Sequence, residues 1–121
     1  MFLARPAAGE DAHGAPEVRA ARASGPISVD GRLDEEAWRH APLATGFLQR
    51  EPSEGSPATE PTELRVLYDD GALYVAARLF DREPRKIVRQ LSRRDDVAEA
   101  DSFSLFLDPH HDHRTGVELQ V

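Results

Sequence analysis

The chain has 121 residues, of which 40% are apolar and 31% charged, and this size and composition predict one globular domain with a modest core. The formal net charge of −7 disfavours binding to nucleic-acid phosphates. The chain has no cysteine, which excludes disulfides, thiolate nucleophiles and zinc–thiolate sites. No segment approaches the ~18 consecutive apolar residues of a membrane helix, so we expect no membrane contact by this segment.

Residues 1–26 are rich in Ala, Gly and Pro and show no apolar periodicity. Such a stretch buries too little surface to offset the entropy of ordering it, so we predict a flexible leader or linker. It is not an intact secretory signal, because Arg5 and Pro6 interrupt its apolar start. We expect order to begin with a short strand at Ile27–Val29, followed by a turn at Asp30-Gly31.

A short helix is predicted between this turn and Pro42. Asp34 is a suitable N-cap, because its carboxylate can accept hydrogen bonds from the first free backbone N–H groups. Leu33 and Trp38 have the spacing of a hydrophobic staple across that cap. We therefore expect Trp38, the only tryptophan, to be buried in the core and absent from any ligand site.

The remaining sequence alternates in the manner of β-strands. Its clearest pattern is a hairpin in which Asp69-Asp70-Gly71 joins two alternating segments. Strands are expected over residues 44–49, 62–68, 72–80, 101–108 and 115–121, with a polar loop over 51–61 and a short strand or irregular edge near 87–91. The positions expected to face inward are Leu64, Val66, Tyr68, Leu73, Val75, Ala77, Leu79, Phe103, Leu105, Leu107, Val117, Leu119 and Val121. Tyr74 and Phe106 lie on the opposite faces and are the best exposed aromatic candidates.

This element order predicts an all-β fold, an antiparallel two-sheet β-sandwich with one short N-terminal helix. The domain is expected to span residues 27–121. Because the strand Thr115–Val121 ends without a turn residue, we expect the sandwich to be incomplete at its C-terminal end. The inward residues of that strand should then be less buried than those of the central hairpin.

The strongest polar candidates are Arg94, Asp95 and Asp96, in a loop that runs to Asp101. Carboxylates beside a planar guanidinium suit hydrogen bonding to neighbouring sugar hydroxyls. Carboxylates also suit calcium, which takes several oxygen ligands. A solvated loop whose opposite charges pair weakly is an equally good interpretation.

The segment His110-His111-Asp112-His113 contains residue types that bind metals, but it also reads as an ordinary polar hairpin loop, which we favour. Its metal-binding status is unknown from sequence. Catalysis is the weaker interpretation, because the chain has no nucleophile-elbow serine and no phosphate-binding glycine loop. Carboxylate pairs remain the one catalytic chemistry that the sequence leaves open.

The segment Ile27–Trp38 (ISVDGRLDEEAW) is similar to the opening signature of family-9 carbohydrate-binding-module-like domains. Further pieces resemble the family in the same order: 62–66, 68–70, 73–75, 94–96, 101–103 and 107–108. The resemblance implies a β-sandwich that binds glycans, some members with calcium. Sugar-binding members resemble one another in clamping a sugar between two tryptophans, whereas this chain has only Trp38.

We therefore expect a non-catalytic carbohydrate-binding module that binds glycan through Arg94, Asp95 and Asp96. The resemblance also implies that this segment belongs to a longer, exported bacterial protein, placed in the periplasm, at the outer membrane or outside the cell. The alternatives are a structural or docking domain without sugar binding and a fragment of a glycoside hydrolase.

Overall fold

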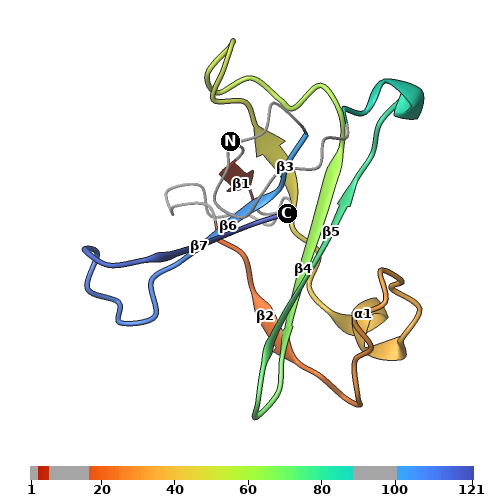
Figure 1. The fold of residues 1–121 in the computed structure, drawn as a ribbon, viewed down its shortest axis with the longest axis vertical. Helices are drawn as coiled ribbons and strands as arrows, with labels where there is room; N and C mark the ends of the chain where they lie inside the picture. Colours follow the sequence, from red (N-terminus) through yellow and green to blue (C-terminus); the bar gives the residue numbers. More distant parts are fainter. Residues whose placement is uncertain (1–2, 6–16, 89–100) are drawn as a thin grey trace. The chain divides into compact units, whose positions relative to one another are not determined.

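The computed structural model describes residues 3–5, 17–88 and 101–121, and the chain forms two compact units, Met1–Arg82 (unit 1) and Glu83–Val121 (unit 2) (Figure 1). The elements of unit 1 are β1 (Leu3–Arg5), β2 (Ala20–Arg22), α1 (Glu36–His40), β3 (Thr45–Leu48), β4 (Thr62–Tyr68) and β5 (Leu73–Leu79). Those of unit 2 are the 3-10 helix η1 (Pro84–Lys86), β6 (Ser104–Leu107) and β7 (Val117–Gln120). Strands make up most of the regular secondary structure of the described residues, which agrees with the predicted all-β class.

Strands β4 and β5 form the predicted antiparallel hairpin in continuous register. Its turn is closed by Asp69, whose Oδ1 accepts hydrogen bonds from the N–H groups of Gly71 and Ala72 at 2.7 and 2.8 Å. Asp in a turn commonly bonds to the backbone two residues on, which fixes the chain reversal locally. The hairpin prediction is confirmed.

The predicted core face of this hairpin is wrong in part. Leu67 and Ala76 are buried on one face, whereas Leu73 and Leu79, expected to face inward, are exposed on the other. Helix α1 explains the difference, because its Trp38 packs in one cluster with Leu67 and Ala76. The face that the helix covers becomes the main core, whatever the hydrophobicity of the opposite face.

Tyr74 lies on this covered face, directly across from Leu67, and is half-buried against the cluster. The prediction that Tyr74 is an exposed aromatic is therefore wrong. On the opposite face Leu64 is buried, as predicted.

Strand β2 is a feature that the sequence did not predict. It runs parallel to residues 66–68 of β4, and the N–H of Ala23 donates to the carbonyl oxygen of Tyr68 at 2.8 Å. Ala21 and Ala23 pack against the core cluster. The prediction that order begins at Ile27 is wrong, because a parallel pairing with a distant strand leaves no local turn signal in so short a segment.

Residues Ile27–Val29 are not a strand in the structure. The N–H of Ser28 donates to Oε1 of Glu35 at 2.8 Å, so a side chain takes the hydrogen bond that a neighbouring strand would need. Val29 is exposed. The alternation of these residues therefore reflects an extended segment held by Glu35.

Helix α1 confirms the predicted helix but begins later than expected. Glu35, not Asp34, occupies the N-cap, and it makes no capping hydrogen bond because its carboxylate contacts Ser28. Trp38 is 5% exposed, and Leu33 packs against the same cluster. The predicted core role of Trp38 is confirmed.

Strand β3 falls within the segment predicted to be a strand and pairs antiparallel with β1. Ala44, just before β3, exchanges two backbone hydrogen bonds of 2.9 Å with Leu64 of β4. One edge of β4 therefore holds Ala44 and β2, and its other edge holds β5 (Figure 1).

In unit 2, strands β6 and β7 form an antiparallel hairpin within the two predicted strands. Phe106 is exposed, as predicted. Val117, Leu119 and Val121, which were predicted to face inward, are exposed as well. They are less buried than Leu64 of the central hairpin, but Leu73 is as exposed as Val117, so the predicted difference holds only in part. Near residue 87 the described chain has η1 and no strand, and residues 89–91 of the predicted edge lie outside the described residues.

Taken together, the described strands form three small sheets, ordered β1-β3, β2-β4-β5 and β6-β7. The predicted pair of fully antiparallel sheets is not confirmed, and the parallel β2–β4 pairing departs from it. Over the described ranges we find no helix with the length and apolar character needed to cross a bilayer.

Candidate functional site

The predicted sugar contacts Arg94, Asp95 and Asp96 lie outside the described residues. The chain on either side of them is described: Oδ2 of Asp101 accepts a hydrogen bond from the N–H of Val88 at 3.0 Å. Val88 and Asp101, which flank the segment 89–100, are therefore in contact in unit 2. Asp101, which the sequence placed at the end of the acidic loop, has a structural role at that junction.

A cavity of about 870 Å³ lies beside strand β5 in unit 1. It is lined by residues of the 27–34 segment, by Trp38 and by every residue of β5. Successive residues of a strand face opposite sides of its sheet, so a cavity that contacts all of them runs along the strand edge. Among the described strands β5 pairs only with β4, which leaves this edge without a partner strand.

The turn at Asp30-Gly31, predicted from the sequence, shapes the wall opposite β5. Gly31 has a φ of 81°, in the left-handed region that glycine adopts without steric cost. Arg32 N–H donates to Oδ1 of Asp30 at 2.8 Å, which closes the turn. This turn places Arg32 and Asp34 among the residues that line the cavity.

The cavity combines two kinds of surface. Ser28, Arg32, Asp34 and Arg78 supply hydrogen-bond donors and acceptors, and exposed apolar side chains such as Leu79 lie among them. Polar groups that converge within an apolar frame are typical of small-molecule sites. Sequence reasoning missed these residues, because positions 32, 34 and 78 become neighbours of one cavity only through the fold.

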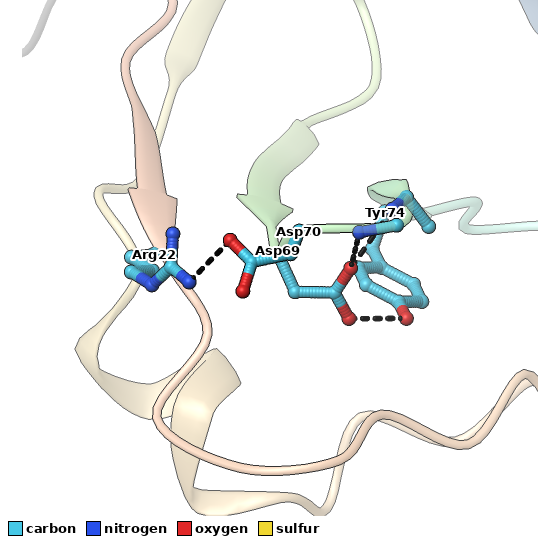
Figure 2. Close-up of polar contacts among 6 residues, drawn as sticks. Arg22, Asp69, Asp70 and Tyr74 are labelled. Carbon is cyan, nitrogen blue, oxygen red and sulfur yellow. Dashed lines mark hydrogen bonds and ion pairs between the residues drawn. The ribbon is translucent and has the colours of Figure 1, made fainter.

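Polar contacts at the hairpin turn adjoin this region, because Tyr74 also lines the cavity (Figure 2). The Tyr74 hydroxyl donates to Oδ2 of Asp69 at 2.8 Å. Hydrogen bonds from the N–H of Gly71, the Tyr74 hydroxyl and the N–H of Ala72 lower the pKa of Asp69. The same contact with Asp69, followed by burial, raises the pKa of Tyr74, which stays a neutral donor committed to the turn.

On the other side of the turn, Arg22 of β2 contacts Asp70 with a nitrogen–oxygen distance of 2.6 Å (Figure 2). The Arg22 guanidinium carbon also lies 6.0 Å from the centre of the Tyr68 ring, within reach of a weak cation–π contact. The Asp69 cluster closes the turn, and the Arg22–Asp70 contact joins β2 to it, so Asp69 and Asp70 are structural residues.

In unit 2, the loop between β6 and β7 carries the histidines that the sequence raised as metal ligands. Hydrogen bonds from the loop backbone lower the pKa of Asp108, that from the N–H of His113 most strongly. Asp112 has a lowered pKa because the N–H groups of Thr115 and Arg114 donate to it. In the described ranges, no group of three or more His, Cys, Asp or Glu side chains is placed to share a metal ion. The segment forms the connecting loop of the β6–β7 hairpin, as predicted.

Residues 29–118 match the family model described as carbohydrate family 9 binding domain-like. The chain belongs to this family. Searches of curated proteins and of solved structures give no match. The matched region contains residues 29–38 of the opening motif, the rest of α1, the β4–β5 hairpin, the segment with Arg94–Asp96, strand β6 and the start of β7. Family membership confirms the resemblance seen in the sequence and indicates carbohydrate binding in general terms.

Proposed function

We propose that this family-9-like domain is a non-catalytic carbohydrate-binding module. Membership of the family over residues 29–118 is the observation that carries the proposal. The proposed fold is the two-sheet β-sandwich predicted from the sequence. The protein would act as part of a longer, exported polypeptide in the periplasm, at the outer membrane or outside the cell.

Arg94, Asp95 and Asp96 are our proposed polar contacts to the glycan. A guanidinium donates in a planar fork while a carboxylate accepts, so the three together can pair with adjacent hydroxyls of a sugar ring. The family match covers the segment that carries them, which supports this role. Calcium stays a prediction for the same carboxylates, which are the ligand type that it prefers.

The cavity beside β5 is a second place where a sugar could bind. Its volume of about 870 Å³ is large enough for a sugar of more than one residue, and Arg32 and Arg78 lie on its two walls. The buried Trp38 lines this cavity but is 5% exposed, so little of its ring is available for stacking. We rank Arg94–Asp96, the acidic segment, above the cavity because its consecutive residues combine hydrogen-bond donors with acceptors.

Isothermal titration calorimetry of the chain against a panel of soluble oligosaccharides tests the proposal. For a glycan that binds, Asp96→Asn should weaken affinity at least about tenfold, the loss of one charged hydrogen bond. Glu54→Gln removes one negative charge from an exposed loop residue away from the cavity lining and is the matched control.

Arg78→Gln distinguishes the two locations. If Arg78→Gln abolishes binding while Asp96→Asn leaves it unchanged, the glycan occupies the cavity beside β5 and the acidic segment is excluded. If no glycan of the panel binds with or without added calcium, carbohydrate binding by this chain is contradicted.

A docking role without sugar binding is the second candidate. It is favoured by apolar side chains on the face of β5 opposite the core cluster, where Leu73 and Leu79 are exposed and also line the cavity. A face of this kind commonly contacts another protein surface. If no glycan of the panel binds, the docking role becomes the preferred function.

A further inference from the structure

The loop between β6 and β7 carries three of the five histidines of the chain, His110, His111 and His113. All three are exposed. Their side chains are not among the proposed glycan contacts, and none of them is buried by the described residues of unit 2. Imidazole is the side chain that proteins use most often to bind zinc, copper and nickel.

The backbone of this loop is held by two carboxylates. Asp108 accepts hydrogen bonds from the N–H groups of Asp112 and His113 at 3.2 and 2.9 Å. Asp112 accepts from the N–H groups of Arg114 and Thr115, at 2.9 and 2.8 Å, and from the Thr115 hydroxyl at 2.9 Å. These five bonds fix the chain on both sides of the histidine rings, so bringing the rings together requires little further ordering.

His111 and His113 adopt left-handed backbone conformations, with φ of 50° and 55°. Their rings lie next to one another with a centroid separation of 4.9 Å, and their planes are tilted by 59°. No such contact involves His110 among the described ring pairs. The loop therefore selects two of its three histidines and places their rings side by side.

The separation of these rings agrees with two imidazoles on one metal ion. Zinc lies about 2.0–2.1 Å from a ligating imidazole nitrogen, and therefore about 3.2 Å from the centre of that ring. Two rings that bind one ion at an angle of about 90–110° then have centroids about 4.5–5.2 Å apart. The observed 4.9 Å falls within this range.

We propose that His111 and His113 form a two-imidazole site for a divalent transition-metal ion. The described residues offer no third His, Cys, Asp or Glu ligand beside them, so water completes the coordination. With nitrogen ligands the order of affinity among divalent ions favours nickel and copper over cobalt and iron. The charges of Asp108 and Asp112, held in the same loop, favour a cation. This site is independent of glycan binding.

Titration of the chain with NiCl₂ near neutral pH, without a polyhistidine tag, tests the proposal by calorimetry. We expect one Ni²⁺ ion per chain. His111→Asn and His113→Asn should each weaken binding of Ni²⁺ about 100-fold. With one imidazole removed, the ion loses the affinity that a second ligand on the same loop adds by binding intramolecularly. Asparagine tolerates the left-handed conformation of both positions, so the loop is retained.

His110→Asn, in the same loop, and His40→Asn, on α1, are the matched controls and should leave the affinity unchanged. In NMR spectra, paramagnetic Ni²⁺ should broaden the ring protons of His111 and His113 before those of the other histidines. An unchanged amide signal for Thr115 in each variant shows that the loop is intact. Equal affinity in all four variants, or equal loss in His110→Asn and His111→Asn, would overturn the proposal and leave an ordinary ring contact.

Discussion

The hairpins β4–β5 of unit 1 and β6–β7 of unit 2 have the same antiparallel pairing in continuous register, yet their apolar side chains differ greatly in burial. Leu67 of β4 is 1% exposed, whereas Leu119 of β7 is 53% exposed. The difference comes from α1, which packs Trp38 against one face of the first hairpin. Strand pairing satisfies backbone hydrogen bonds by itself, but removing apolar area from water requires a second surface.

The turns of the two hairpins, by contrast, use the same chemistry. Asp69 accepts backbone N–H groups in unit 1, and Asp108 and Asp112 do so in unit 2. Local sequence therefore specifies both chain reversals equally well. The two hairpins differ in tertiary packing and not in how their turns are made.

The largest effect is expected at the residue that creates this difference. Trp38→Ala should lower the free energy of unfolding by about 3–5 kcal/mol, because it removes the largest side chain of the core cluster. Phe106→Ala, at an exposed aromatic of β6, should change it by less than about 0.5 kcal/mol. Urea denaturation followed by circular dichroism measures both, and equal losses would contradict the role assigned to α1.

Trp38→Phe separates packing from hydrogen bonding at this position. Among the described residues the buried indole Nε1 has no hydrogen-bond partner, so its loss removes an unsatisfied donor along with part of the ring. We expect Trp38→Phe to retain most of the stability that Trp38→Ala loses. A loss of stability as large as that of Trp38→Ala would show that Nε1 makes a hydrogen bond that stabilises the fold.

Leu67 and Leu119 allow the same substitution to be compared at a buried and at an exposed position. Leu67→Ala should cost about 2–5 kcal/mol, as buried leucine truncations do. Leu119→Ala removes the same atoms from a half-exposed position and should cost less than about 1 kcal/mol. The same urea titration measures both. A cost at Leu119 that approaches that at Leu67 would mean that β7 is covered in solution.

The elements that local signals define could be predicted from the sequence. The β4–β5 hairpin and the short helix are correct because a turn, a cap region and side-chain alternation lie within a few residues of one another. The role of Trp38 is correct for the same reason. The face of β5 was wrong because alternation leaves two faces to choose from, and only the position of α1 decides between them.

Features that join distant segments could not be predicted. Strand β2 is only three residues long, and it is a strand because it pairs with the edge of β4. The cavity beside β5 needs the turn at Gly31 to bring residue 32 to the same cavity as residue 78. For the candidate site, the sequence named Arg94, Asp95 and Asp96, which lie outside the described residues, and missed the cavity.

Acid should act on the turns of both hairpins alike. The pKa values of Asp69 and Asp108 are lowered from 3.8 by backbone N–H donors, chiefly those of Gly71 and His113. A lowered pKa in the folded state means that the stabilisation is complete above 3.8 and is lost as the pH falls through the folded value. We therefore expect no change in turn structure between neutral pH and about pH 5, and loosening only in stronger acid.

Carboxyl carbon shifts in NMR titrations measure these values directly. Both midpoints should lie below 3.8, and the amide signals of Gly71 and His113 should shift in the same window. Asp69→Asn and Asp108→Asn should each remove the response of one turn only. A midpoint at or above 3.8 in either residue would contradict the hydrogen bonds assigned to it.

The smallest effect is expected where β2 joins the hairpin of unit 1. The Arg22–Asp70 contact is short, at 2.6 Å, but 56% of the arginine and 88% of the aspartate side chain are exposed. Water and salt screen such a pair, so a double-mutant cycle of Arg22→Gln and Asp70→Asn should give a coupling of about 0.2–1 kcal/mol that decreases in 1 M NaCl. What holds β2 is its backbone pairing with β4 and the packing of Ala21. Ala21→Asp should therefore destabilise unit 1 more than the loss of Arg22 does. A coupling above about 2 kcal/mol, unaffected by salt, would instead make the ion pair the main anchor of β2.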